Sequence, residues 1–164
     1  MQNRNRPIHL ALFQPEIPQN TGAAMRLCAC MGIPLDIIEP TGFLWDEAKI
    51  RRSAMDYIDH VTLHKHANWD SFRADYAQNR VLLLTTKSDQ SYLDFAFQDG
   101  DILLAGQESA GAPEYVHAQV DARLTIPMPG GVRSMNVVNA CAMVVGEAMR
   151  QLTHAQTNIK KAAQ

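Results

Sequence analysis

The sequence has 164 residues and a formal net charge of −2, with 46% apolar and 20% charged residues. This length suits one domain with a substantial core, and the ordinary composition excludes a wholly disordered chain. The near-neutral charge gives no global sign of nucleic-acid binding, so we expect any site for a polyanion to be local.

The apolar pattern contains neither a membrane span nor a signal peptide. No apolar run approaches the ~18 residues that a span needs, and the basic start MQNRNRP leads into a run too short for a signal peptide. Cys28, Cys30 and Cys141 fit a reducing compartment. Because Cys28 and Cys30 fall on different sides of an expected helix, they do not suit a metal clip. We therefore expect a cytoplasmic protein.

Strand-like and helix-like segments alternate along the chain. Short apolar runs predict strands, and apolar residues at every third or fourth position predict helices. In chain order, we expect a strand at 8–13, a helix at 23–31 ended by Gly32, a strand at 35–39, a loop and short helix within 40–57, a strand at 60–64, a helix at 69–78, strands at 80–86, 101–106 and 123–128, and a long helix at 135–153.

This alternation indicates an α/β fold. Continuously apolar strands separated by helices are typical of a mainly parallel sheet covered by helices on both faces. We expect one domain over residues 1–155 and a disordered polar tail over residues 156–164. In open sheets of this kind, ligands bind at the carboxyl ends of the strands.

The turn after the first strand has the composition of a stiff polar loop. It reads PEIPQNTGAAMR over residues 15–26, and its two prolines restrict their own backbone and that of the residues before them. Asn20 or Thr21 can cap the following helix, whose unpaired N–H groups and positive dipole end would then lie near the loop. With Arg26 about one turn further on, the loop is a candidate anion site.

Six segments together resemble the SPOUT-class RNA 2′-O-ribose methyltransferases. The first is PEIPQNTG with Arg26. The others follow in family order: IIEPTGF (37–43), KIRRSAMDY (49–57), LTTK (84–87), GQESAGAP (106–113) and IPMPGGVRSMNVVNA (126–140). They cover most of residues 8–152 and are most similar to those of the small, single-domain tRNA (cytidine/uridine-34) 2′-O-methyltransferases.

The resemblance implies a fold and an activity that composition cannot reveal. The fold would be a SPOUT fold with a C-terminal deep trefoil knot, in a homodimer whose RNA site is shared between subunits. The cofactor would be S-adenosylmethionine, with S-adenosylhomocysteine as product. The substrate would be the anticodon stem-loop of tRNA, methylated at the ribose of wobble nucleotide 34.

The resemblance also assigns roles to particular residues. The cofactor contacts would be Leu84, Thr85, Gly106, Ile126, Met128, Ser134 and Met135. The catalytic set would be Asn20, Arg26, Glu108, Ser134 and Asn136. Because arginine stays protonated, we expect Arg26 to hold a phosphate and stabilise the forming alkoxide rather than to act as a base. Ser134 and Asn136 also open the final helix, where they can serve as caps.

Basic residues give local candidates for RNA contact. They are Lys49, Arg51, Arg52 and Arg133, although the first three can equally form a solvated helix face. The segment HKH (64–66) with His60 fits surface histidines better than zinc ligands, and we expect no metal.

The chain departs from the family pattern at Gln107, at Val137 and Val138, and at Gly146, and two other functions stay open. Gln107 stands where relatives often carry proline, which leaves its loop less constrained. Gly146 stands where relatives often carry tyrosine, and its place in a long helix suits a close helix approach at a dimer seam. The alternatives are the same reaction on another tRNA or rRNA nucleotide, and a non-catalytic knotted RNA-binding protein.

Overall fold

The computed structural model describes the backbone of residues 8–162 and the side chains of residues 8–153. Its centre is one sheet in the order β3-β2-β1-β5-β4-β6, and all neighbouring strands are parallel. The expected α/β fold with a parallel sheet is confirmed. The strands are β1 (Ile8–Phe13), β2 (Leu35–Ile38), β3 (Leu63–His66), β4 (Val81–Leu84), β5 (Asp101–Ala105) and β6 (Ala122–Leu124).

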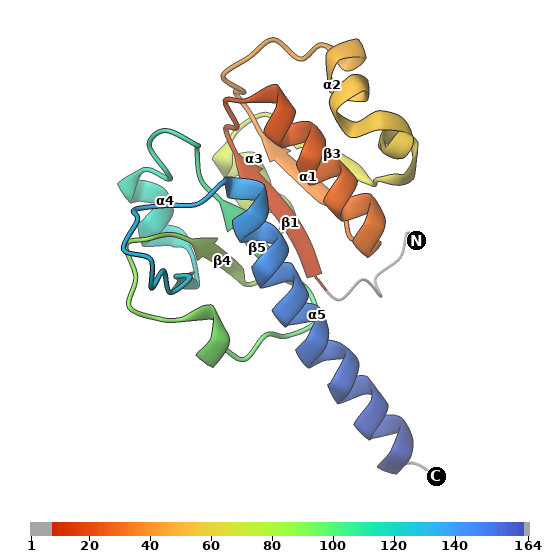
Figure 1. Ribbon diagram of the computed structural model, residues 1–164, viewed down its shortest axis with the longest axis vertical. Coiled ribbons are helices and arrows are strands. Elements are labelled where there is room, and N and C mark those ends of the chain that lie inside the picture. The colour runs from red at the N-terminus through yellow and green to blue at the C-terminus, as the bar shows by residue number, and fades with distance from the viewer. Residues whose placement is uncertain (1–7, 163–164) are drawn as a thin grey trace.

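Helices cover both faces of the sheet (Figure 1). The helices α1 (Pro18–Met31) and α5 (Val137–Ala162) pack on one face, and α3 (Trp69–Asp75) and α4 (Glu114–Gln119) pack on the other. Successive strand residues point to opposite faces. In β1, Leu10 and Leu12 therefore belong to the core under α1 and α5, while Ala11 and Phe13 belong to the other core.

A second helical layer lies against α1. It consists of α2 (Glu47–Ala54) and the 3₁₀ helix η1 (Met55–His60). Asp46 caps α2 by accepting a hydrogen bond from the backbone N–H of Lys49 at 3.2 Å. A Cβ atom at Gly22 of α1 would lie 2.3 Å from the Cβ of Ser53, so only glycine permits this close approach. The contact fixes the position of α2 and of its basic residues.

The start of α1 differs from the sequence prediction. The helix begins at Pro18 rather than at residue 23, and its N-cap is Ile17, which provides no side-chain cap. The capping role expected of Asn20 or Thr21 is therefore wrong, because both lie inside the first turn. Proline suits the first position of a helix, since its missing N–H would be unpaired there in any case.

The middle of the chain differs in two further places. Strand β3 spans Leu63–His66 rather than 60–64, because η1 extends to His60. The short helix α4 and the 3₁₀ helix η2 (Tyr92–Asp94) have no counterpart in the sequence prediction.

The last helix has different ends from those expected. It begins at Val137, after Asn136, and continues to Ala162. Residues 156–162, which the sequence analysis places in the tail, belong to this helix. Residues 163–164 lie outside the described part of the chain. Among the described residues, no helix is both long enough and apolar enough to cross a membrane.

Candidate active site

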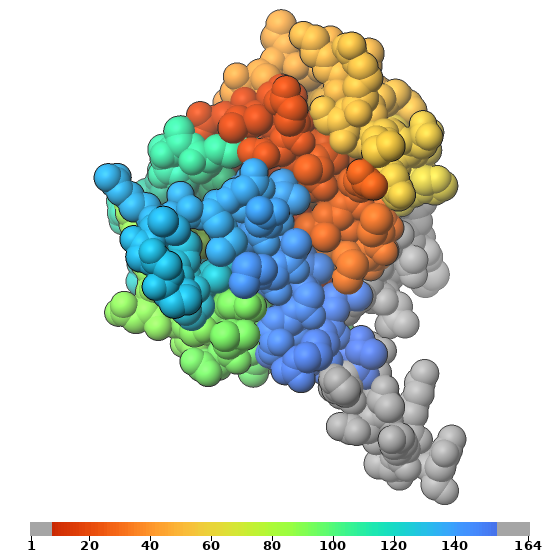
Figure 2. Space-filling view, viewed as in Figure 1, coloured from red at the N-terminus to blue at the C-terminus, as the bar shows by residue number. Residues whose placement is uncertain are grey.

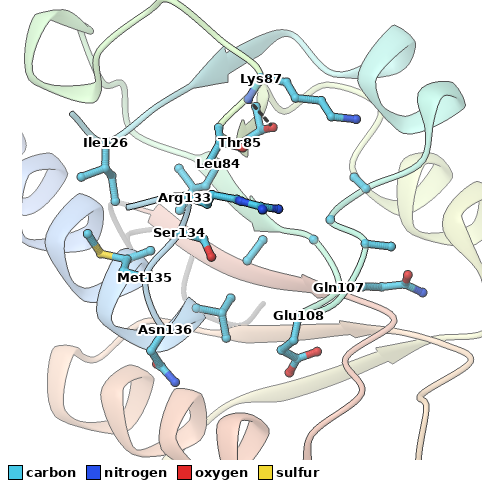
Figure 3. A pocket seen from close by; sticks show the side chains of 18 of the residues that line it. Leu84, Thr85, Lys87, Gln107, Glu108, Ile126, Arg133, Ser134, Met135 and Asn136 are labelled. Atoms are coloured by element: carbon cyan, nitrogen blue, oxygen red, sulfur yellow. Dashed lines mark hydrogen bonds between the residues drawn. The ribbon is translucent and has the colours of Figure 1, made fainter. Parts of the chain in front are cut away.

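A cavity of about 690 Å³ lies at the carboxyl ends of β4, β5 and β6. All seven residues expected to contact a cofactor line it: Leu84, Thr85, Gly106, Ile126, Met128, Ser134 and Met135. In Figure 3, Ile126 and Met135 lie on one side, and Gln107 and Glu108 lie on the opposite wall. The strand ends thus bring together three loops that are far apart in the sequence.

The loop after β5 is folded back on itself beside the cavity. The backbone N–H groups of Gln107 and Gly111 each donate to the carbonyl oxygen of the other at 2.9 Å. The carboxylate of Glu16 accepts hydrogen bonds from Ser109, from its hydroxyl at 2.7 Å and from its backbone N–H at 3.2 Å. These bonds connect the loop to the turn that follows β1.

A line of polar side chains crosses the rim of the cavity. Asn136 Nδ2 donates to Asn20 Oδ1 at 3.2 Å, and Asn20 Nδ2 donates to Glu108 Oε1 at 3.4 Å. Glu108 also accepts from the backbone N–H of Glu16 at 2.8 Å. Four of the five expected catalytic residues, namely Asn20, Glu108, Ser134 and Asn136, line the cavity.

Asn136 has two roles in this arrangement. Its Oδ1 accepts from the backbone N–H groups of Val138 at 2.9 Å and Asn139 at 3.2 Å, which caps α5. Its Nδ2 is thereby directed to Asn20. The capping role expected of Asn136 is confirmed, and the same side chain also contacts Asn20 at the cavity rim.

The structure does not bring Arg26 to the other four residues. Arg26 is exposed on α1 and lies outside the cavity. Its guanidinium group donates to Met55 Sδ at 3.3 Å and lies 5.1 Å from the ring centroid of Tyr57. Arg26 follows Asn20 by six positions on α1, so the two side chains leave the helix about 120° apart.

The expected RNA-contacting residues divide into two groups. Arg133 lines the cavity. Lys49, Arg51 and Arg52 are exposed on α2, which packs against α1. Arg51 is paired with Asp59 at 3.3 Å and with Glu47 at 3.7 Å.

Two further cavity residues were missed by the reasoning from sequence. Lys87 lies at the rim in Figure 3, and its place in the segment LTTK could have pointed to it. His117 lines the cavity from α4. No motif covers His117, and the helix that carries it was not predicted.

A separate buried cluster lies under α3, away from the cavity. Asp36 on β2 is fully buried and accepts hydrogen bonds from His66 Nε2 at 2.7 Å and from the Tyr76 hydroxyl at 2.8 Å. Burial alone would raise the pKa of Asp36, but hydrogen bonds with His64, His66, His9 and Tyr76 outweigh it and hold that pKa well below its usual range. The hydrogen bond to Asp36 raises the pKa of His66.

The histidines of this cluster are bound to the Asp36 carboxylate. Among the side chains that the structure describes, those of residues 8–153, no group of three or more His, Cys, Asp and Glu is arranged to hold a metal ion. The hydrogen bonds of the cluster provide partners for the Asp36 carboxylate, whose burial would be costly without them.

The chain is similar in sequence to known RNA methyltransferases. A family model, the SpoU rRNA Methylase family, matches residues 7–146. A tRNA (cytidine(34)-2'-O)-methyltransferase of Beijerinckia indica is 52% identical over 145 residues, which cover 87% of this chain and 91% of that protein.

Solved structures of RNA methyltransferases have a similar fold. One, reported as structural insights into the 2-OH methylation of C/U34 on tRNA, has a TM-score of 0.86 and 42% identity, covering 90% of this chain and 97% of the other. An AdoMet-bound rRNA methyltransferase from Sinorhizobium meliloti shares the fold at 23% identity and a TM-score of 0.79, covering 88% of this chain and 56% of the other.

Proposed function

The chain belongs to the SpoU rRNA methylase family, and on that premise we propose that it is an S-adenosylmethionine-dependent tRNA 2′-O-methyltransferase. Its target would be the ribose of nucleotide 34, a cytidine or a uridine, as the names of its relatives indicate. The observation that carries the proposal is the cavity, which is lined by all seven expected cofactor contacts and by four expected catalytic residues, with Ser134 in both sets.

The cavity suits the proposed cofactor in size and in chemistry. Its volume of about 690 Å³ lies within the range of small-molecule sites, about 300–1,000 Å³. Leu84, Ile126, Met128 and Met135 provide apolar walls, and the backbone around Gly106 provides hydrogen-bonding groups. When bound, S-adenosylmethionine supplies an activated methyl group on a sulfonium centre.

The residues of the chain would position the ribose and stabilise the charge that develops on its hydroxyl oxygen. The line from Asn136 through Asn20 to Glu108 fixes the orientation of both amides. The carboxylate of Glu108 is itself held by the Glu16 backbone. Held in this way, the Asn20 side chain is preorganised to align the target nucleotide, which is the main requirement of an in-line displacement.

Arg26 would complete the site from a second copy of the chain. Arg26 does not lie at the cavity of its own chain, because it is on the exposed side of α1 beside Tyr57. We infer a homodimer in which Arg26 of each subunit faces the cavity of the other. There its positive charge would hold a substrate phosphate and stabilise the forming alkoxide.

The outer face of α5 offers a surface for this dimer. Asn139, Ala142, Met143 and Gly146 are exposed there at helical spacing. Met143 is 43% exposed, and a Cβ atom at Gly146 would meet nothing within 4 Å. Figure 2 shows α5 beside α1 on one face of the molecule. Small residues on such a stripe permit a close approach by a partner helix.

The basic residues of α2 would contact the anticodon stem outside the cavity. Lys49 and Arg52 are exposed and form no ion pair with any described residue, whereas Arg51 is paired within the chain. Because phosphate contacts release counterions, tRNA binding would weaken as salt increases. The knot and the cytoplasmic location also remain part of this proposal.

The direct test is methyl transfer to tRNA that lacks methylation at nucleotide 34. The protein is incubated with labelled S-adenosylmethionine, and the labelled nucleotide is mapped. Label on the 2′-oxygen of nucleotide 34 supports the proposal. Label at another nucleotide, or cofactor binding without transfer to any RNA, contradicts it in favour of one of the two alternatives.

The role of Arg26 has its own prediction. Arg26→Ala is expected to abolish transfer and to leave the affinity for S-adenosylhomocysteine unchanged, because the proposed contacts of Arg26 are with a substrate phosphate and the forming alkoxide and not with the cofactor. Arg123→Ala, which removes an exposed arginine on β6, is the matched control and should retain activity. A large loss of cofactor affinity in Arg26→Ala would contradict this division of roles.

A mixing experiment tests whether the site is shared. Arg26→Ala and Glu108→Ala proteins, each inactive alone, are mixed and allowed to exchange subunits. About half of the dimers are then mixed, each with one intact site, so about a quarter of wild-type activity should return. If subunits exchange and no activity returns, Arg26 does not serve the partner's cavity.

A further inference from the structure

His117 is a buried polar residue in the wall of the cavity that no motif assigns. It lies on α4, is 9% exposed and lines the cavity together with Ala105 and Ala112. Its neighbour Val116 is fully buried in the core between α4 and the sheet. An imidazole in such an apolar wall is costly unless its nitrogens find partners.

Among the residues that the structure describes, none is a partner for one of these nitrogens. Nδ1 of His117 is buried and has no hydrogen-bond partner among the described residues. A neutral imidazole carries its hydrogen on one nitrogen and a lone pair on the other. Buried N–H groups without an acceptor are rarer than buried acceptors without a donor. This favours the tautomer with the hydrogen on Nε2.

We propose that His117 is a further cofactor-binding residue, whose Nε2–H donates a hydrogen bond to an acceptor atom of S-adenosylmethionine. The inference rests on the proposed function, because it assumes that this cofactor occupies the cavity. With Nδ1 sealed in the protein, Nε2 is the nitrogen left to face the cavity that the ring lines. The acceptor is an oxygen of the ribose or of the carboxylate, or a ring nitrogen of adenine.

A purely structural role for His117 leads to a different expectation. Leucine fills a similar volume without a polar atom, so His117→Leu would then leave ligand affinity unchanged. Glutamine places an N–H donor near the position of Nε2, whereas asparagine places one near Nδ1. The two amide variants therefore distinguish which nitrogen acts.

The test measures the dissociation constant for S-adenosylhomocysteine by calorimetry in the full chain. We expect His117→Leu to weaken binding about 10-fold, with the melting temperature of the free protein unchanged or raised. His117→Gln should restore most of the affinity, and His117→Asn should not. His60→Leu, which replaces an exposed histidine on η1, is the control and should bind like wild type.

A second probe locates the contact on the cofactor. Methylthioadenosine lacks the amino-acid part, so a loss seen for both ligands places the contact on the adenosine, and a loss seen only for S-adenosylhomocysteine places it on the carboxylate. Unchanged affinity of a folded His117→Leu protein for both ligands overturns the inference. If wild type itself fails to bind S-adenosylhomocysteine, the proposed function fails instead.

Discussion

Gly106 should be the glycine of this site least tolerant of a side chain. A Cβ atom there would lie 2.5 Å from the carbonyl carbon of Gly111 and 2.6 Å from the backbone nitrogen of Ala112. Ordinary contacts between carbon atoms are about 3.5–4.0 Å, so the facing backbone would have to move by about 1 Å. Both atoms belong to the main chain, and no rotamer change can relieve the contact.

The cost of Gly106→Ala follows from what this movement breaks. The two hydrogen bonds between Gln107 and Gly111, each 2.9 Å long, close the loop and would be stretched. Each is worth about 1 kcal/mol, and overpacking typically costs about 1–3 kcal/mol. We expect the unfolding free energy to fall by about 3–5 kcal/mol, which lowers the melting temperature by about 6–20 °C in a domain of this size.

The same substitution should also weaken the cofactor site. Glu108 follows in the same loop, so its hydrogen bonds to Glu16 and Asn20 would be displaced. We expect affinity for S-adenosylhomocysteine to fall about 10- to 100-fold, equivalent to about 1.4–2.8 kcal/mol. The assays are thermal unfolding and calorimetric titration of the same preparation.

Gly130→Ala is the matched control. A Cβ atom at Gly130 would meet nothing within 4 Å, and this residue lies in the loop that leads to Ser134. The Gly130→Ala variant should therefore have the melting temperature and the affinity for S-adenosylhomocysteine of the wild type. If Gly106→Ala matches wild type in both assays, the loop does not depend on this close backbone approach, and the reasoning is refuted.

Two further predictions concern the dimer and the buried cluster. Met143→Glu on the exposed face of α5 should convert the dimer to a monomer in sedimentation velocity. The control Leu93→Glu, at an exposed leucine on η2, should leave the dimer intact. An unchanged mass for Met143→Glu would show that this face of α5 is not the dimer interface. Asp36→Asn should lower the unfolding free energy by about 3 kcal/mol. The raised pKa of His66 stabilises the fold fully below pH ~6.5, and this stabilisation is lost as the pH rises through the raised pKa. The loss of unfolding free energy in Asp36→Asn should therefore be larger at about pH 5.5 than at about pH 9. Urea unfolding at both pH values measures it, and an equal deficit would show that His66 is not coupled to Asp36.

Much of the sheet could be predicted because its strands are buried on both faces. Strands β1 and β5 are apolar except at His9 and Asp101, and their predicted bounds differ from the structure by at most one residue. The edge strand β3 reads LHKH, with no apolar run to mark it. Its buried His66 is hydrogen-bonded to Asp36 on the neighbouring strand, a long-range pairing that local pattern does not reveal.

The site could be predicted in part for a similar reason. Segments such as 106–113 and 126–140 carry motifs, and their residues meet because parallel strands end at one edge of the sheet. Arg26 shares a motif with Asn20, yet helical geometry separates them, so adjacency in sequence was misleading. His117 lies on a helix of six residues, too short for a periodic signal.

Gln107 shows how the structure changes the reading of a departure from the family pattern. Loss of a proline suggests a looser loop, but Gln107 Nε2 donates to Gln14 Oε1 at 3.0 Å. Gln14 has a left-handed φ of 44°, a costly conformation for a residue with a side chain. Its backbone N–H donates to Ile38 at 2.9 Å, so it is held at both backbone and side chain.

Glutamine in place of proline at position 107 replaces a restraint within one loop by a connection between two segments, the loop after β5 and the turn after β1. A proline fixes only its own φ and restricts the residue before it. The amide of Gln107 instead links the loop that carries Glu108 to the turn that leads to Asn20. Together with the bonds from Ser109 to Glu16, this gives three side-chain connections between the same two segments. The relative position of Glu108 and Asn20 is therefore fixed by contacts across the cavity rim rather than by the stiffness of either loop alone.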